Sequence, residues 1–193
     1  MANVTRGYGL FEDFLAKKRT IRANHLIKNV DKDKVLDIGC GSYPYFLLNC
    51  TFKQKYGIDP SLTTLNIKDL KLDKIDVTKK PLSFDDNYFD AVTMLAVFEH
   101  IEYDKLSFVL KEVRRVLKKD GIFIITTPAP WADKFLHIMA RFQLISSEEI
   151  HEHKHNHSKE KIEDILSKAG FNKRKIKSGF FEIYMNMWFS ASK

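Results

Sequence analysis

Residues 35–46 read VLDIGCGSYPYF, and this stretch decides the fold. Its apolar run ends at Ile38 and is followed at once by Gly39 and Gly41, which is typical of a buried parallel strand leading into a ligand-binding loop. A dinucleotide-binding loop has the spacing G-x-G-x-x-G, which places the third glycine at position 44. Proline occupies that position. The sequence therefore predicts a nucleotide-binding loop and argues against a bound pyrophosphate.

The bulk composition is that of an ordinary globular protein, with 193 residues, 44% hydrophobic and 30% charged. The first residues lack the apolar core of a secretory signal, and no apolar run approaches the roughly 18 residues that a membrane-spanning helix needs. Two cysteines, Cys40 and Cys50, are too few for a disulfide framework. We therefore expect one domain over residues 1–193, with reduced cysteines and a cytoplasmic location.

The net charge is +7, from 32 Lys and Arg against 25 Asp and Glu. The basic residues form short clusters at 17–22, 111–119 and 173–177. Such clusters are typical of solvated helix faces, and also of surfaces that attract an anionic partner such as a nucleotide-linked substrate, RNA or a membrane. Charge alone does not choose among these alternatives.

The periodicity of apolar residues predicts alternating strands and helices from residue 34 to residue 127. Strands are expected at 34–38, 53–58, 72–75, 88–97, 122–127, 172–177 and 180–191. Helices are expected within an N-terminal segment (1–30), from residue 44, and over 104–118, 131–145 and 158–168. This order predicts an α/β fold: a doubly wound, Rossmann-like, mostly parallel seven-stranded sheet with helices on both faces and an antiparallel terminal strand.

Ligands of such sheets bind beyond the carboxyl ends of the strands. Gly39, Asp59, Asp76 and His100 each follow a predicted strand, so we expect them at one edge of the sheet. Asp59 lies 20 residues after Gly39, where a carboxylate can accept both hydroxyls of an adenosine ribose. The alternative for Asp59 is a turn before Pro60. Asp76 either accepts from an adenine amino group or forms a surface turn.

Five motifs occur in a fixed order: VLDIGCGS (35–42), YGIDPS (56–61), IDV (75–77), FDAVTMLAVFEHI (89–101) and GIFIITTP (121–128). Together they resemble the class I S-adenosylmethionine-dependent methyltransferases, and their spacing resembles the subgroup that acts on small molecules, lipids and sugars. The resemblance covers residues 34–128 well and the C-terminal part loosely. It implies methyl transfer from S-adenosylmethionine, with S-adenosylhomocysteine as the product.

The resemblance also implies where the cofactor lies. By resemblance, Asp37 and the loop after it match the part of the family that binds the methionine end of the cofactor. The Asp37 carboxylate suits the ammonium group of that end, and the backbone N–H groups of the loop suit its carboxylate. The family often has glycine at the position of Tyr43, so this side chain either narrows the loop or packs over the cofactor. The loop residues concerned are Gly39, Cys40, Gly41, Ser42 and Tyr43.

Three further positions are implied in the same way. Asp59 with Pro60 matches the site that binds the ribose diol. Asp76 and Val77 match the adenine-binding pair. Leu95 and Ala96, at the end of the fourth strand, match residues that line the sulfonium.

Transfer of a sulfonium methyl is an in-line displacement, for which the protein must mainly align the reactants and exclude water. A neutral acceptor also needs a base. His100 is a candidate base or acceptor-orienting residue, and its alternative is a helix-start residue bonded to nearby backbone. The resemblance places a second acceptor-side candidate at His153, five residues before Ser158.

Residues 129–157 follow the fifth strand and, by resemblance, cover the acceptor. Their large apolar side chains form either a lid or ordinary helix packing. The run HEHKHNH (151–157) places four histidines on one face if it is extended, which would suit a transition metal. The spacing matches no metal-site pattern and methyl transfer requires no metal, so we expect a solvated loop and no metal.

The leading hypothesis is a methyltransferase acting on a small-molecule or metabolite acceptor, one that is lipid- or sugar-linked or anionic. An RNA or protein methyltransferase is the enzyme alternative, although the position after the fourth strand reads LAVF and not an Asn-Pro-Pro-Tyr-like motif. A relative that binds the cofactor without turnover is the non-enzyme alternative. A NAD-dependent enzyme is the weakest, because Pro44 stands where its third glycine belongs.

Overall fold

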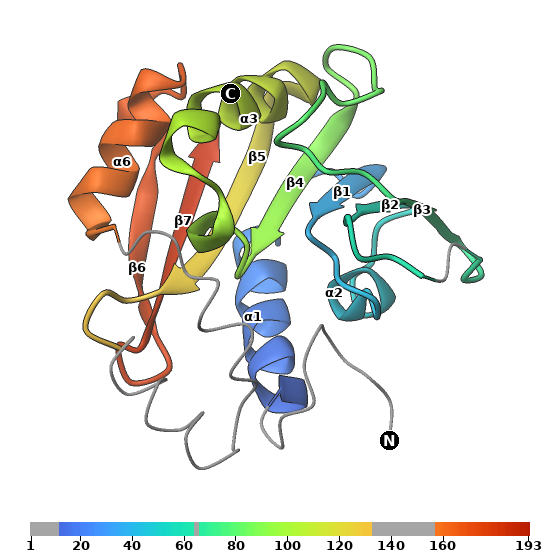
Figure 1. Ribbon diagram of the computed structural model, residues 1–193, viewed down its shortest axis with the longest axis horizontal. Coiled ribbons are helices and arrows are strands. Elements are labelled where there is room, and N and C mark those ends of the chain that lie inside the picture. The colour runs from blue at the N-terminus through green and yellow to red at the C-terminus, as the bar shows by residue number, and fades with distance from the viewer. Residues whose placement is uncertain (1–11, 64–65, 133–156) are drawn as a thin grey trace.

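A seven-stranded sheet forms the centre of the protein (Figure 1). The computed structural model describes residues 12–63, 66–132 and 157–193. The strand order is β3-β2-β1-β4-β5-β7-β6, in which β7 runs antiparallel to both of its neighbours and β1 to β5 pair in parallel. This confirms the predicted sheet. The strands are β1 (Lys34–Ile38), β2 (Gln54–Ile58), β3 (Leu70–Asp73), β4 (Phe89–Leu95), β5 (Leu117–Pro128), β6 (Lys177–Phe181) and β7 (Asn186–Ser192).

Helices cover both faces of the sheet, as expected for a doubly wound fold. One face carries α3 (Tyr103–Val116) and α6 (Lys159–Lys168), and the other carries α1 (Glu12–Leu26) and the short α2 (Tyr45–Leu48). Two 3₁₀ turns, η1 (Phe98–His100) and η2 (Lys173–Lys175), complete the described elements. The predicted cap of α6 is confirmed, because the Ser158 hydroxyl accepts a hydrogen bond from Lys161 N at 3.3 Å.

Each helix layer seals its own apolar core. The buried side chains of α3 recur every three or four residues and pack against β4 and β5, which is why its sequence shows a clear helical period. Within β1, Val35 belongs to the core beneath α1 and α2, while Leu36 belongs to the core beneath α3. A strand buried on both faces reads as a continuous apolar run, so β1 was predicted with its observed bounds.

The C-terminal region differs from the prediction. The expected strand at 172–177 is the 3₁₀ turn η2, capped by Asn172, and the expected strand at 180–191 is a hairpin made of β6 and β7. The turn between them uses left-handed backbone at Glu182, Ile183 and Tyr184. None of these residues is a usual turn former, so the sequence gives no warning of the reversal.

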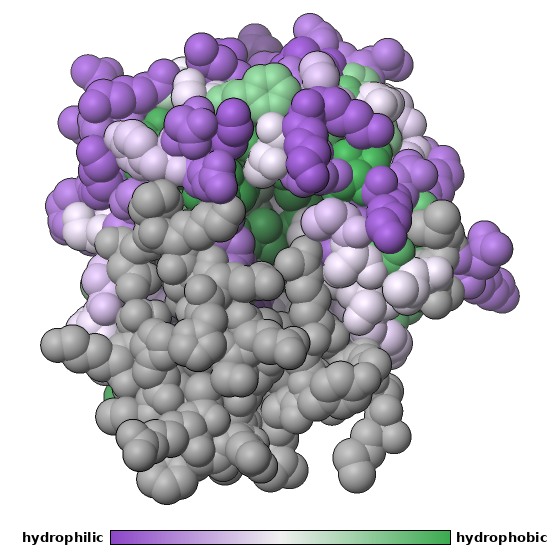
Figure 2. Space-filling view, viewed as in Figure 1, coloured by the Kyte–Doolittle hydropathy of each residue, from purple (hydrophilic) through white to green (hydrophobic). Residues whose placement is uncertain are grey.

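Two smaller boundaries also shift. The third strand covers Leu70–Asp73 instead of 72–75, and α3 ends at Val116 instead of Lys118. The Asp120–Gly121 turn lies inside β5, where the pairing with β4 jumps from Leu117 to Ile122. Outside the residues drawn in grey, the face shown in Figure 2 is mainly hydrophilic, and hydrophobic residues are visible inside a hollow near its centre. Among the described helices, none has the length and apolar character needed to cross a bilayer.

Candidate active site

The loop after β1 turns where its two glycines adopt left-handed backbone, with φ of +75° at Gly39 and +71° at Gly41. A Cβ atom on Gly39 would lie 2.2 Å from a methyl carbon of Val97, so no side chain fits at this position. The Gly39 N–H donates to the carbonyl of Ile58 at 2.7 Å. The glycine therefore lets the loops after β1 and β4 touch.

Asp59 ties the ends of β1 and β2 together and is only 1% exposed. Its Oδ2 accepts from Gly41 N at 3.1 Å, and its Oδ1 accepts from the N–H and hydroxyl of Ser61 at 2.7 and 2.5 Å. Asp59 lines neither of the two cavities described below.

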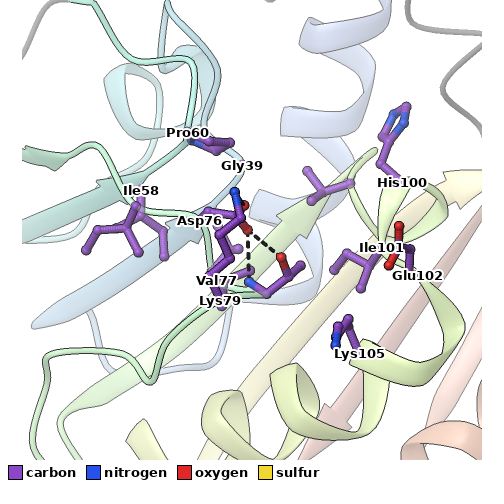
Figure 3. A pocket seen from close by; sticks show the side chains of 14 residues that line it. Gly39, Ile58, Pro60, Asp76, Val77, Lys79, His100, Ile101, Glu102 and Lys105 are labelled. Atoms are coloured by element: carbon purple, nitrogen blue, oxygen red, sulfur yellow. Dashed lines mark hydrogen bonds and ion pairs between the residues drawn. The ribbon is translucent and has the colours of Figure 1, made fainter.

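A pocket of about 770 Å³ opens at the carboxyl ends of β1, β2 and β4 (Figure 3). Ile58, Pro60 and Val77 contribute one side, and His100 and Ile101 contribute another. The walls combine apolar side chains with polar and charged ones in similar amounts. The full lining is Ile38, Gly39, Ile58, Pro60, Ile75, Asp76, Val77, Thr78, Lys79, Val97, His100, Ile101, Glu102 and Lys105.

Asp76 is one of two carboxylates that line this pocket, and Glu102 is the other. Asp76 accepts hydrogen bonds from the N–H and the hydroxyl of Thr78 at 3.0 and 2.6 Å, and its Oδ2 lies 2.9 Å from Lys79 Nζ. The Thr78 hydroxyl, helped by the nearby Lys79, holds the pKa of Asp76 below its usual value, while partial burial opposes the shift. Asp76 is therefore an ionised hydrogen-bond acceptor at neutral pH.

A second, smaller cavity of about 40 Å³ lies on the other side of Gly39, beneath α1. Its most buried acid is Asp37, which is 4% exposed and accepts a hydrogen bond from the Thr93 hydroxyl at 2.6 Å. Burial raises the pKa of Asp37 to about 7, although the Thr93 hydrogen bond opposes the shift. Such a carboxylate gains strongly from a cationic partner. The cavity is lined by Ala16, Arg19, Thr20, Asp37, Gly39, Cys40, Tyr43, Tyr45, Phe46 and Leu95.

Arg19 is a site residue that sequence reasoning missed. It reaches the small cavity from α1, and its Nε is buried without a hydrogen-bond partner. A buried guanidinium nitrogen with no acceptor suits a bound carboxylate. The sequence offered only a basic cluster on a helix, and nothing in it showed that this helix lies against the loop after β1.

The family model for a methyltransferase domain matches residues 36–125, the stretch that runs from β1 into β5. Residues 36–125 are a methyltransferase domain. The resemblance drawn from the sequence motifs is confirmed for this stretch, and the order and directions of the strands confirm the expected Rossmann-like fold of class I.

Relatives of the methyltransferase domain include a protein of Methanocaldococcus jannaschii that is 39% identical over 103 residues, covering 52% of this chain and 44% of the relative. A ubiquinone biosynthesis O-methyltransferase of Pelagibacter ubique is 33% identical over 125 residues, covering 57% of this chain and 50% of that protein. The chain thus spans about half the length of these curated relatives.

One similar solved structure is a SAM-dependent methyltransferase of Archaeoglobus fulgidus. It superposes with a TM-score of 0.71 at 20% identity, covering 95% of this chain and 98% of that one. At 20% identity, this similarity shows a shared fold and nothing about the acceptor.

The structure divides the sequence-predicted site residues between the two cavities. Gly39 lines both; Pro60, Asp76, Val77 and His100 line the large pocket; Asp37, Cys40, Tyr43 and Leu95 line the small one. Four predicted residues line neither cavity: Gly41, Ser42, Asp59 and Ala96. Ala96 holds left-handed backbone (φ +55°) directly after β4, and His153 lies outside the described residues, as do 133–156 of the predicted acceptor cover.

Proposed function

We propose that the protein is an S-adenosylmethionine-dependent methyltransferase that transfers a methyl group by in-line displacement to a small-molecule, lipid-linked or sugar-linked acceptor. The observation that carries this proposal is a pair of cavities that meet at Gly39. One offers apolar side chains and an ionised acceptor, and the other has a buried acid and a guanidinium nitrogen without a hydrogen-bond partner. Adenosine suits the first cavity, and a zwitterionic amino acid suits the second.

The large pocket supplies the contacts that an adenosine needs. Ile58, Val77 and Ile101 offer apolar surfaces for the two faces of a purine, and Asp76 offers an acceptor for its amino group. Asp59 lies next to Pro60, at the end of β2. Its carboxylate already orients the loop through Gly41 N and would accept the ribose hydroxyls.

The small cavity supplies complementary charges for the methionine end. Asp37 is the partner for the ammonium group, and Arg19 is the partner for the carboxylate. Leu95 closes the cavity from the end of β4, where the sulfonium would lie. Tyr43 belongs to the same lining, which favours packing against the methionine end over blocking the loop.

When bound, S-adenosylmethionine supplies an activated methyl group, so the chain need not contribute a nucleophile. The residues of this chain align the donor and exclude water from it. We propose His100 as the group that takes a proton from, or orients, a neutral acceptor, since it stands on the wall of the large pocket. The predicted role of His153 on the acceptor side remains a proposal from the resemblance.

Calorimetry with S-adenosylhomocysteine tests the site. Asp59→Asn removes the charge while keeping the shape, and we expect it to weaken binding by roughly 10-fold to 100-fold, the range of a lost charge-assisted hydrogen bond. Asp164→Asn is the matched control, because Asp164 pairs with Lys168 on the surface of α6. Equal affinities for the wild type and Asp59→Asn, with both proteins folded, would remove the site assignment.

Turnover needs a separate measurement. Release of S-adenosylhomocysteine should be followed across separate panels of small phenols and amines, isoprenoid-linked phenols, sugar-linked metabolites, and RNA or protein acceptors. Transfer to one of the first three panels is the expected result. Transfer only to RNA or protein contradicts the acceptor class, and tight binding without transfer to any panel favours a non-catalytic relative.

A further inference from the structure

The turn between β6 and β7 holds two large apolar side chains in water. Ile183 is 89% exposed and Tyr184 is 67% exposed. Together with Glu182 they adopt left-handed backbone, with φ of 53°, 54° and 64°. This conformation is unfavourable for non-glycine residues and most of all for a β-branched one such as Ile183. Strain of this kind persists where the surroundings enforce it, and it concentrates at functional sites.

Hydrogen bonds and ring contacts fix the turn in this shape. Met185 N donates to the carbonyl of Glu182 at 3.0 Å, and the Asn186 side chain donates to the Glu182 carboxylate at 2.5 Å. The rings of Phe180 and Tyr184 lie 5.6 Å apart. Phe180 is itself 39% exposed. The tip is thus an ordered projection with an apolar surface.

Two other segments lie against this hairpin and expose apolar side chains of their own. Ala129 N donates to the carbonyl of Met185 at 2.8 Å, which places the loop after β5, with Trp131 55% exposed, beside the tip (Figure 1). On α1, the Arg22 guanidinium lies 5.6 Å from the Phe181 ring centre and 5.8 Å from that of Trp188. Arg22 therefore reaches from α1 to side chains of the hairpin.

Helix α1 brings positive charge to the same region. The helix contains four Lys and Arg, and its two acidic residues, Glu12 and Asp13, are the first two of the helix. Phe14 and Ile21 are 51% and 55% exposed, and the Lys18 ammonium lies 5.1 Å from the centre of the Phe14 ring. Arg19, and to a smaller extent Lys18, act electrostatically on Glu182 in the turn, so the positive charges of α1 lie near the tip. We call the set Phe14, Lys17, Lys18, Ile21, Trp131, Phe180, Ile183 and Tyr184 the hairpin patch.

We propose that the hairpin patch docks the protein on an anionic lipid surface. A projecting Ile-Tyr tip enters a deformable interface, aromatic rings with a polar end occupy the headgroup level, and lysines beside them meet lipid phosphates. A nucleic acid fits less well, because Ile183 and Ile21 neither stack on bases nor donate hydrogen bonds. The docked orientation brings the end of β5 to the membrane, which selects a lipid-borne acceptor; this last point alone rests on the proposed function.

Vesicle sedimentation tests the proposal without requiring turnover. The full chain is mixed with vesicles of phosphatidylcholine alone, or of phosphatidylcholine with phosphatidylglycerol. We expect binding to the anionic vesicles that decreases with salt. The double variant Ile183→Ser/Tyr184→Ser should lower the partition coefficient by about 10-fold or more. Lys17→Gln/Lys18→Gln should lower it by about 25-fold at low salt, since each lysine near an anionic surface contributes roughly a fivefold gain.

A matched control separates the patch from general stickiness. Phe108→Ser/Lys119→Gln changes an exposed aromatic and an exposed lysine on α3 and at the start of β5, away from the hairpin, and should leave sedimentation unchanged. All variants should keep the circular dichroism spectrum and the thermal unfolding midpoint of the wild type, which shows that they fold. Three results would overturn the proposal. The wild type and the patch variants sediment equally, the protein binds neutral vesicles as well as anionic ones, or the patch residues are needed for binding RNA or a protein and not vesicles. None of these results bears on cofactor binding, so the two proposals fail separately.

Discussion

Replacing Asp37 by Asn should stabilise the protein and weaken cofactor binding at the same time. Asp37 is 4% exposed, and burial raises its pKa to about 7 from the ordinary value of 3.8. A group whose pKa is raised on folding favours the folded state while it stays protonated. That contribution is complete below the unfolded pKa and is lost as the pH rises through the folded pKa. Above neutral pH, the ionised Asp37 carboxylate therefore lowers the free energy of unfolding of the protein without bound cofactor.

The magnitude follows from the size of the shift. A difference of about three pKa units corresponds to about 4 kcal/mol at pH 8, and at about pH 5 the same linkage gives about 2 kcal/mol. Asp37→Asn lacks the charge and keeps the shape, so it should raise the free energy of unfolding by up to these amounts. The gain should shrink steadily as the pH falls, because Asp37 in the wild type becomes protonated.

Cofactor binding should respond in the opposite direction. If the Asp37 carboxylate pairs with the ammonium group, the affinity of the wild type for S-adenosylhomocysteine should fall about tenfold per pH unit below about pH 7. Asp37→Asn should bind weakly at every pH, with little slope. Adenosine has no ammonium group and should bind both proteins alike.

Thermal unfolding from about pH 5.5 to pH 8.5 measures the stability, and calorimetry over the same range measures the affinity for S-adenosylhomocysteine. A variant that is less stable than the wild type at pH 8 would show that burial does not penalise the Asp37 charge. Wild-type binding that stays flat through pH 7, with the same affinity in Asp37→Asn, would remove the ammonium contact. Either result refutes the reasoning.

Two further predictions concern the walls of the small cavity. Arg19→Leu should weaken S-adenosylhomocysteine binding by roughly 10-fold to 100-fold, the range of a hydrogen bond to a charged group, and should leave adenosine binding unchanged; an equal loss for both ligands would show that Arg19 acts only through the fold. Gly39→Ala places a Cβ 2.2 Å from a Val97 methyl group at φ +75°, so it should lower the free energy of unfolding by more than about 2 kcal/mol. Val97→Ala in the same chain should recover part of that loss in a denaturant titration, and full tolerance of Gly39→Ala alone would contradict the contact.

The centre of the sheet was predictable because β1 and β4 are buried on both faces and are followed by clear turns. β1 matched residue for residue, and α3 showed its period through five buried positions. The C-terminal hairpin was not predictable, since IYMNMWF reads as one apolar run and the turn lacks Gly, Pro and a short polar pair. There the backbone is held by tertiary contacts that no local pattern reports.

The candidate site was predictable only where strand ends supply it. Asp59 and Asp76 follow from the rule that carboxyl ends of strands meet at one edge, whereas Asp37 was named only through the family resemblance. The rule does not say how a carboxylate is used, and Asp59 proved to bind the loop backbone in the described structure. Arg19 was beyond reach for another reason, because its place depends on how α1 packs against a loop 20 residues further along the chain.

The proposed ligand site has two compartments of very different size, and Gly39 lines both. A molecule that fills both is, in thermodynamic terms, two linked fragments, and each fragment raises the local concentration of the other. Adenosine and an amino acid offered separately should therefore bind far more weakly than the same groups joined through sulfur. Release after the reaction would then be easiest one compartment at a time.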